Sequence, residues 1–326
     1  ICVGRSDEFE KPGDYRVMTI SRDEVVILRD HDGVLRAMSN ICRHRMMSLL
    51  EGEGSIGGKI TCPYHAWTYT LDGQLNGAAH MWESFDKRNC RLPQFAVEEW
   101  LGWVFVTLNS DAPKVADQLH QVEDMVAGYD MTNYTETFYE EHVWDTNWKV
   151  LAENFMESYH LPVCHAGTIG GLSKLEDMIC PPGEPAFNYH TILKDETLRI
   201  AMAHDSNGRL KGDERRTTFL LALYPSLLIT LTPGYFWYLS LHPVSPGQVH
   251  IRFGGGMSDD YKDDSDAQQN FADLKALLDD VNVEDRGCTE KVYNGLCSAL
   301  STPGHLSHLE RPNYDFAQYL NARINS

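Results

Sequence analysis

The sequence predicts an α+β protein of two domains, an all-β domain over residues 1–112 and an α+β domain over residues 113–326. In the N-terminal region, short segments that alternate apolar and polar residues are separated by turns rich in Gly and Asp, a pattern that predicts antiparallel strands. Beyond residue 113, helix-like and strand-like patterns both occur, and consecutive strand-like segments predict an antiparallel sheet flanked by helices. Residues 109–113 form the predicted linker between the two domains.

The composition and net charge of the chain exclude some classes of binding partner. The chain has 28 Lys and Arg against 47 Asp and Glu, a net charge of −19, which argues against a nucleic-acid backbone or an anionic membrane surface as partner. It has no apolar run long enough to cross a membrane, and its first residues do not form a signal segment. A reduced, cytoplasmic protein is predicted because six cysteines lack close, regular spacing: Cys2, Cys90, Cys164, Cys180, Cys288 and Cys297.

The elements of the first domain are predicted from period-two alternation. Residues 15–20 and 24–28 are expected to form neighbouring strands. Residues 68–75 are expected to form a hairpin around an Asp-Gly turn. The strongly apolar segment 100–108 is the strand expected to close this domain.

One motif, made of two short Cys–His pairs, lies in the loops of the first domain. Cys42 and His44 form a C-x-H pair, and Cys62 and His65 form a C-x-x-H pair. Two thiolates and two imidazoles can hold a [2Fe-2S] cluster, with the thiolates on one iron and the imidazoles on the other. A zinc site is the alternative, but zinc fingers usually place their cysteines together and their histidines together. The pairing therefore favours the two-iron cluster, which is Rieske ligation.

A second motif opens the α+β domain, within residues 147–165. Its apolar residues follow helical spacing, so it is predicted to begin as a helix and to break at Pro162. Glu157 and His160 are three residues apart and are expected on one helical face, with His165 returning from the following loop. Two neutral imidazoles suit Fe(II) in a 2-His-1-carboxylate site, although histidines at a helix end often bind nothing.

The rest of the second domain is predicted as a β-meander followed by two helices. The meander covers residues 219–257, and its aromatic run 235–238 could line a substrate pocket or cage a quaternary ammonium group. Ordinary core packing is the favoured interpretation of these rings, because alternation turns only half of them inward. Residues 266–280 are predicted as an amphipathic helix, and residues 283–300 as a further, separate helix.

These motifs and their neighbours resemble the α subunits of ring-hydroxylating Rieske oxygenases. The resemblance covers most of the first 110 residues and the second motif, where Asn-Trp-Lys precedes Glu-Asn and the two histidines. It implies a Rieske domain followed by a helix-grip, START-like catalytic domain that holds a mononuclear Fe(II). The residues that carry it in the first domain are His44-Arg45, Gly52-Glu53-Gly54, Cys62 to Tyr69 and Asp72-Gly73.

The resemblance also implies roles for acidic residues. Relatives take the carboxylate ligand of the mononuclear iron from an acidic pair at the start of the late helix, which assigns this role to Asp285, with Glu284 and Asp280 as alternatives. In the family, a buried carboxylate bridges a cluster histidine of one subunit and an iron histidine of the next within a head-to-tail trimer. Glu157 holds that position here, where many relatives have Asp.

The function implied by the resemblance is that of a terminal oxygenase component. Electrons would come from NAD(P)H through a separate reductase or ferredoxin, and O2 would be used to hydroxylate or oxidatively dealkylate a small organic substrate. A cis-dihydroxylating dioxygenase of aromatic-compound catabolism is the alternative, and a Rieske electron carrier without oxygenase activity is a distant one. A homotrimer is expected, with or without a β subunit.

The sequence leaves the substrate open. Arg199, Arg209 or Arg252 could anchor a carboxylate, or each could be a solvated surface charge. The acidic overall charge does not indicate a cationic substrate, because net charge describes the surface and not the pocket.

Overall fold

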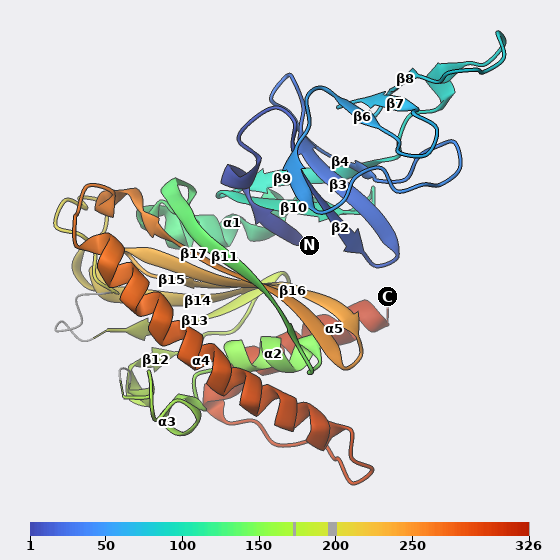
Figure 1. Ribbon diagram of the computed structural model, residues 1–326. Helices are drawn as coiled ribbons and strands as arrows, with labels where there is room; N and C mark the ends of the chain where they lie inside the picture. The colour runs from blue at the N-terminus through green and yellow to red at the C-terminus, as the bar shows by residue number, and fades with distance from the viewer. Residues whose placement is uncertain (172–173, 195–200, 326) are drawn as a thin grey trace. The chain divides into compact units, whose positions relative to one another are not determined.

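The computed structural model describes residues 1–171, 174–194 and 201–325 (Figure 1). The chain divides into two compact units, Ile1–Gln118 and the residues from Leu119 onward. The boundary predicted after residue 112 lies a few residues earlier, in the loop before α1 (Val115–Val126). None of the helices within the described residues is long and apolar enough to span a membrane.

The first unit consists of two antiparallel sheets. The larger has the order β1-β10-β9-β4-β3-β2-β5, and the smaller is the three-stranded β6-β7-β8. The strands of the larger sheet are β1 (Cys2–Arg5), β2 (Asp14–Ile20), β3 (Asp23–Arg29), β4 (Leu35–Ser39), β5 (Glu53–Ser55), β9 (Gln94–Trp100) and β10 (Trp103–Thr107). The smaller sheet contains β6 (Lys59–Thr61), β7 (Thr68–Thr70) and β8 (Leu75–Gly77).

Sequence alternation accounts for these strands. β2 is mostly partly buried, with Arg16 buried and Thr19 exposed, whereas the four central residues of β3, Val25 to Leu28, are all buried. These four residues divide between two core clusters because successive side chains point to opposite faces of the sheet. One of the clusters contains Cys42 and Cys62, so the predicted cluster loops are packed against a hydrophobic core.

The second unit is built on one seven-stranded antiparallel sheet with the order β11-β17-β16-β15-β14-β13-β12. Its strands are β11 (Tyr134–Trp144), β12 (Met178–Ile179), β13 (Phe187–Leu193), β14 (Thr217–Leu223), β15 (Leu227–Leu231), β16 (Tyr235–Ser245) and β17 (Gln248–Ser258). The predicted meander is therefore confirmed. Its helices, besides α1, are α2 (Trp148–Phe155), α3 (Leu161–Cys164), α4 (Ala267–Leu296) and α5 (Arg311–Ile324).

Helix α4 runs across one face of this sheet (Figure 1). Phe271 and Leu274 of α4 pack against Trp237 and Phe253 of the sheet. The prediction of two separate helices is wrong, because α4 continues without a break through residues 280–283. Nothing in that stretch stops a helix, since it contains neither Gly nor Pro, and Val281 is buried at the junction.

Candidate active site

Helix α2 leads into the second motif. The Asn147 side chain caps its first turn by accepting a hydrogen bond from the Lys149 backbone N–H at 2.9 Å. The helix ends at Phe155, earlier than predicted, and Pro162 lies in the first turn of α3 instead of breaking α2. Proline is tolerated there because the first helical N–H groups have no partner within the helix.

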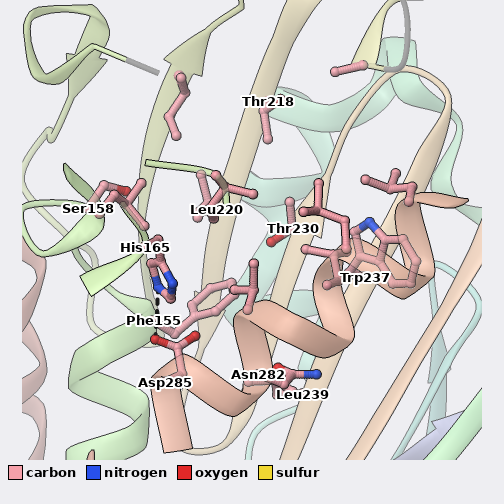
Figure 2. A pocket seen from close by; sticks show the side chains of 18 of the residues that line it. Phe155, Ser158, His165, Thr218, Leu220, Thr230, Trp237, Leu239, Asn282 and Asp285 are labelled. Atoms are coloured by element: carbon pink, nitrogen blue, oxygen red, sulfur yellow. Dashed lines mark ion pairs between the residues drawn. The ribbon is translucent and has the colours of Figure 1, made fainter. Parts of the chain in front are cut away.

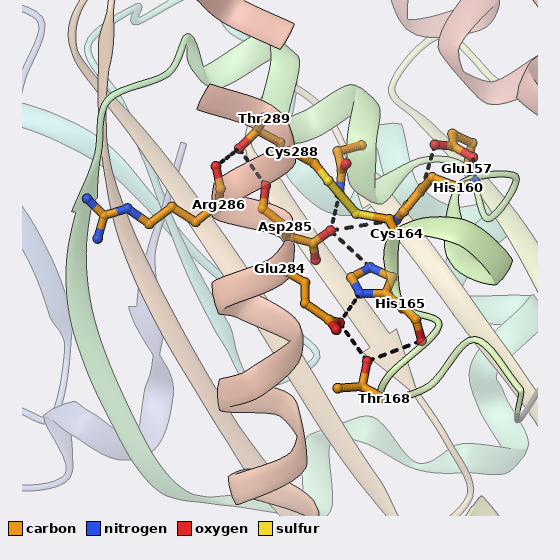
Figure 3. The surroundings of a disulfide bond; sticks show 11 residues. Glu157, His160, Cys164, His165, Thr168, Glu284, Asp285, Arg286, Cys288 and Thr289 are labelled. Carbon is orange, nitrogen blue, oxygen red and sulfur yellow. Dashed lines mark hydrogen bonds and ion pairs between the residues drawn. A yellow bond between two sulfur atoms is a disulfide. The ribbon is translucent and has the colours of Figure 1, made fainter. Parts of the chain in front are cut away.

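The two histidines of this motif lie beside a carboxylate of α4. Nε2 of His165 is 3.1 Å from Oδ1 of Asp285, and Nε2 of His160 is 3.6 Å from the same oxygen (Figure 3). One ligand atom from each of these three side chains lies within 4.8 Å of the other two. Two imidazole nitrogens and one carboxylate oxygen converging in this way match the donor set of a 2-His-1-carboxylate iron site.

The other ring nitrogen of each histidine, Nδ1, donates its N–H hydrogen bond to a different carboxylate. Nδ1 of His160 is 2.5 Å from Oε1 of Glu157, and Nδ1 of His165 is 2.7 Å from Oε2 of Glu284. A carboxylate on Nδ1 fixes the tautomer with the proton on that nitrogen, which leaves the Nε2 lone pair for a metal. Glu157 and His160 lie beyond α2, so they meet through this hydrogen bond and not on the predicted helical face.

The environment of His165 is strongly acidic. His165 is 1% exposed, and burial by itself would lower the pKa of its imidazole, but Asp285 and Glu284 raise that pKa overall. Hydrogen bonds from Thr168 and His165 lower the pKa of Glu284. A carboxylate on each nitrogen of one buried imidazole favours positive charge at this site.

The three candidate carboxylates of α4 occupy different positions. Asp285 lies in the ligand cluster and accepts a hydrogen bond from Asn154 Nδ2 at 2.8 Å. Glu284 contacts the opposite nitrogen of His165, whereas Asp280 is exposed and lies outside the cluster. The expectation that an acidic pair begins the late helix is wrong, because both residues lie inside α4.

A disulfide joins the two segments that carry these side chains. Cys164 of α3 is bonded to Cys288 of α4, and their Cα atoms are 7.3 Å apart (Figure 3). The prediction that all cysteines are reduced is therefore wrong for this pair, whereas Cys2, Cys90, Cys180 and Cys297 form no disulfide within the described residues. The partners are 124 residues apart in sequence, so spacing gave no sign of the pairing.

A cavity of about 480 Å³ opens onto the histidines and Asp285 (Figure 2). Its walls come from α2, α4 and the sheet, and most of its lining residues are apolar. Tyr235, Trp237 and Tyr238 line it, whereas Phe236 is fully buried elsewhere in the core, so three of these four rings face the cavity and not the half that alternation predicts. Trp237 stacks on Phe271 with ring centroids 4.9 Å apart, so core packing describes this ring better than a cation cage.

Of the arginines considered as anchors, the two that the structure describes, Arg209 and Arg252, do not line the cavity. Arg209 pairs with Asp260 at 2.9 Å, and Arg252 is buried with its Nε donating to Tyr238 at 2.9 Å. Arg199 lies outside the described residues. The lining residues contain Lys194 instead, whose role the sequence did not indicate.

A buried histidine behind the motif was also missed. Nε2 of His190 on β13 lies 2.8 Å from the hydroxyl of Ser158. Ser158 lies between Glu157 and His160 in the sequence. Burial, with a smaller contribution from His160, lowers the pKa of His190 to about 3. His190 is therefore neutral at pH 7 and holds the backbone of the motif through Ser158. The contact could not be predicted because it depends on where β13 lies in the sheet.

In the first unit, the four residues of the cluster motifs lie together. Cys42 and Cys62 are free and buried, and the rings of His44 and His65 have centroids 4.7 Å apart. Nδ1 of His44 is buried and has no hydrogen bond within the described part of the chain, which leaves it available for a metal. The Tyr69 hydroxyl lies 3.3 Å from Cys42 Sγ, where it can donate to a thiolate. These residues fit a [2Fe-2S] cluster.

Two family models match the chain. A Rieske [2Fe-2S] domain model matches residues 1–95, and a model of the ring-hydroxylating α subunit, catalytic domain, matches residues 130–326. The carnitine monooxygenase oxygenase subunit of Acinetobacter baumannii is 39% identical over 65% of this chain and 56% of its own length. Putrescine 2-hydroxylase of Ralstonia nicotianae is 30% identical over 76% of this chain and 67% of its own length.

Solved structures show the same fold. The quaternary ammonium Rieske monooxygenase CntA matches with a TM-score of 0.82 at 24% identity, over 100% of this chain and 88% of its own. Naphthalene 1,2-dioxygenase from a Rhodococcus species matches with a TM-score of 0.82 at 20% identity, over 98% of this chain and 88% of its own. The alignment with the carnitine monooxygenase subunit spans just over half of that relative's length.

Proposed function

The chain belongs to the Rieske-type ring-hydroxylating oxygenase α subunits, and from this premise we propose that it is the terminal oxygenase of a multicomponent monooxygenase. The observation that carries the proposal is the convergence of His160, His165 and Asp285 beside an apolar cavity. An electron carrier has no use for such a site. The distant alternative of a carrier is therefore disfavoured.

The chain's own residues divide into two metal-holding sets. Cys42, His44, Cys62 and His65 would hold the [2Fe-2S] cluster, and His160, His165 and Asp285 would hold Fe(II). When bound, these groups supply single-electron transfer and O2 activation.

The surrounding residues prepare the site for this chemistry. Glu157 and Glu284 hold the protons of the two imidazoles on Nδ1, so that both Nε2 atoms remain ligands. These three protein ligands would leave a bound Fe(II) accessible to O2. The cavity excludes water from its apolar wall and presents a substrate C–H bond to that side of the site.

Mono-oxygenation is favoured by the relatives that are similar in sequence, which are named for carnitine, glycine betaine and putrescine. All three names denote small organic amines or ammonium compounds. Naphthalene 1,2-dioxygenase is similar to this chain in fold, at 20% sequence identity. This similarity therefore does not favour the cis-dihydroxylating alternative over mono-oxygenation.

The proposal also covers the electron donor, the oligomeric state and the cellular compartment of the protein. No nicotinamide-binding or flavin-binding pattern is evident in the sequence, so a separate reductase or ferredoxin would deliver electrons. A cytoplasmic homotrimer is proposed, in which Glu157 passes electrons from the cluster of a neighbouring copy to the iron site.

The test begins with metal analysis of anaerobically purified, iron-reconstituted protein. About three irons and two acid-labile sulfides per chain are expected, with a Rieske signal in the electron paramagnetic resonance spectrum after reduction. His165→Ala should lose one iron and keep the Rieske signal. O2 uptake with incorporation of one ¹⁸O atom into product completes the test. Two irons in the reconstituted wild type would indicate an electron carrier, and zinc without sulfide would refute the cluster assignment.

A further inference from the structure

The sheet that forms one wall of the cavity carries a hydroxyl in an apolar setting, at Thr230 of β15. Directly paired residues share one face of a sheet, and Thr230 pairs with Leu220 on one side and with Trp237 on the other. All three residues line the cavity, and Figure 2 shows Thr230 between the other two. The Thr230 hydroxyl makes no hydrogen bond within the described residues, and its oxygen keeps accessible surface. Only water or a ligand can therefore complete its hydrogen bonding.

The register of the sheet places Thr230 within reach of the candidate iron site. The row of paired residues continues from Thr230 through β14 to His190 on β13, whose Nε2 contacts the hydroxyl of Ser158. Neighbouring strands are about 4.8 Å apart, so Thr230 lies about 10 Å from His190 across the sheet. In the other direction the row reaches Trp237, which stacks on Phe271 of α4. Thr230 therefore lies on the face of the sheet that α4 covers.

A second uncharged polar group lies on α4, at Asn282. It precedes Asp285 by three residues, so it lies about 4.5 Å along the helix from the carboxylate that faces the histidines. Asn282 is partly buried and lines the cavity, and Figure 2 shows it on the same helix as Asp285. Its carboxamide makes no hydrogen bond to the described part of the chain. Two N–H donors and one acceptor oxygen are therefore available to a bound molecule.

The surroundings of these two groups favour an uncharged ligand group. Several further lining residues from the sheet and α4 are apolar, among them Leu239, Leu274, Leu278 and Val281. Neither Thr230 nor Asn282 is charged, so a charged group bound to them would lose its hydration without gaining a counter-charge from them. Lys194, a cationic lining residue, follows the end of β13 and lies four residues beyond His190, outside the row that contains Thr230. An uncharged polar group needs only hydrogen bonds to offset its desolvation.

A carboxamide matches the hydrogen-bonding groups of both side chains. A primary amide has an acceptor oxygen beside an N–H donor, and the Asn282 side chain presents the complementary donor and acceptor in the same plane. Two parallel hydrogen bonds can therefore form between them. The carbonyl oxygen of the ligand keeps a second lone pair, to which the Thr230 hydroxyl can donate.

We propose that Asn282 and Thr230 form an uncharged subsite that binds a carboxamide group of the substrate. The apolar chain or ring attached to that group then extends toward His160, His165 and Asp285. The substrate class is therefore a small primary amide with an apolar body. This inference rests on the proposed function, since it assigns the subsite to the substrate of the same oxygenase.

The test measures binding to the metal-loaded protein under anaerobic conditions by isothermal titration calorimetry. The probes are 3-phenylpropanamide, 3-phenylpropanoate and 3-phenylpropylammonium, which share one body and differ in the charge of the head group. The amide should bind at least about tenfold more tightly than either charged probe, because hydrogen bonds alone can offset the desolvation of its head group.

Variants separate the subsite from general packing. Asn282→Leu keeps the size of the side chain and removes two hydrogen bonds, so it should weaken amide binding about 5- to 50-fold and binding of the charged probes by less than about threefold. Thr230→Val should weaken amide binding about 2- to 10-fold, whereas Thr230→Ser, which keeps the hydroxyl, should stay within about twofold of the wild type. Asn294→Leu, at an exposed position of α4, is the matched control and should change nothing.

The outcomes separate this inference from the proposed function. A charged probe that binds as tightly as the amide, no binding of any probe, or an Asn282→Leu variant that weakens all three probes equally would overturn the amide subsite. Amide binding that is unchanged in both Asn282→Leu and Thr230→Val would show that these groups bind only water. An unchanged Rieske spectrum and melting temperature show that each variant is folded. An amide-selective subsite in a protein that never consumes O2 would support the subsite and refute the oxygenase.

Discussion

Glu284 is predicted to set the iron affinity of the site without being a ligand. Its Oε2 accepts hydrogen bonds from His165 Nδ1 at 2.7 Å and from Thr168 Oγ1 at 2.6 Å. Glu284→Gln keeps the size of the side chain and one acceptor oxygen but removes the negative charge. The imidazole then loses the partner that holds its proton on Nδ1 and strengthens Nε2 as a ligand.

The size of the affinity loss follows from the two hydrogen bonds whose acceptor becomes neutral in Glu284→Gln. A hydrogen bond to a charged group contributes about 1.5–3 kcal/mol and a neutral one about 0.5–1.5 kcal/mol, so the bond from His165 loses roughly 1–1.5 kcal/mol. The bond from Thr168 adds less, because Glu284 is 27% exposed and solvent screens part of its charge. A total of about 1–2 kcal/mol corresponds to a loss of about 5- to 30-fold in Fe(II) affinity.

The assay is an anaerobic titration of protein that retains its cluster but lacks the mononuclear metal, with Fe(II) or with Co(II) as a spectroscopic probe. The Rieske spectrum in the same sample reports that the chain is folded. Asp280→Asn is the matched control, since it removes a carboxylate from an exposed position of the same helix and should leave the affinity unchanged.

Two results would refute this reasoning. Equal Fe(II) affinities for Glu284→Gln and the wild type would show that the carboxylate does not tune His165. Complete loss of the metal in Glu284→Gln, together with retention in Asp285→Asn, would make Glu284 the ligand and exchange the roles of the two residues.

The remaining predictions concern His190 and Glu157. The pKa of His190 is about 3 in the folded protein and about 6.5 in the unfolded chain. Between pH 3 and pH 6.5 the unfolded chain therefore binds one more proton than the folded protein. The free energy of unfolding should fall by about 1.4 kcal/mol for each pH unit as the pH drops through this range. His190→Gln should lack this part of the acid dependence in urea unfolding; identical slopes for the two proteins would contradict it. Glu157→Gln should retain both metals and nearly abolish coupled turnover, so undiminished electron transfer in a single turnover would rule out its role.

The metal-binding motifs were predictable because each pairs residues that are close in sequence. Cys42 and His44, like Cys62 and His65, need only one loop to bring their side chains together. The mononuclear site was predictable in part, since its two histidines share one short segment but its carboxylate comes from a helix more than a hundred residues away. Asp285 could be singled out from the sequence only through a family resemblance.

Contacts set by the sheet and by helix packing were not predictable. Ser158 and His190 are 32 residues apart, and the disulfide partners Cys164 and Cys288 are 124 residues apart. Both pairs depend on which strands neighbour each other and on where α4 crosses the sheet. Lys194 was overlooked for the same reason, because its place in the cavity follows from the pairing of β13 with β14.

The position of Glu284 and Asp285 inside α4 explains how one helix serves both nitrogens of His165. Successive helical residues project about 100° apart, so neighbouring carboxylates can lie on either side of one imidazole ring. Glu284 contacts Nδ1 at 2.7 Å and Asp285 contacts Nε2 at 3.1 Å. At a helix end, these residues would lie in a turn that frays.

Within α4, the two carboxylates are held from both sides. Val281 is 7% exposed and Thr289 is 1% exposed, so the helix is anchored in the core one turn before and one turn after the site. Cys288 then ties the same turn to the segment that carries His165. The geometry of the candidate iron site is therefore fixed by the burial of α4 and by the covalent link to α3, and both act on the backbone and not on the ligands themselves.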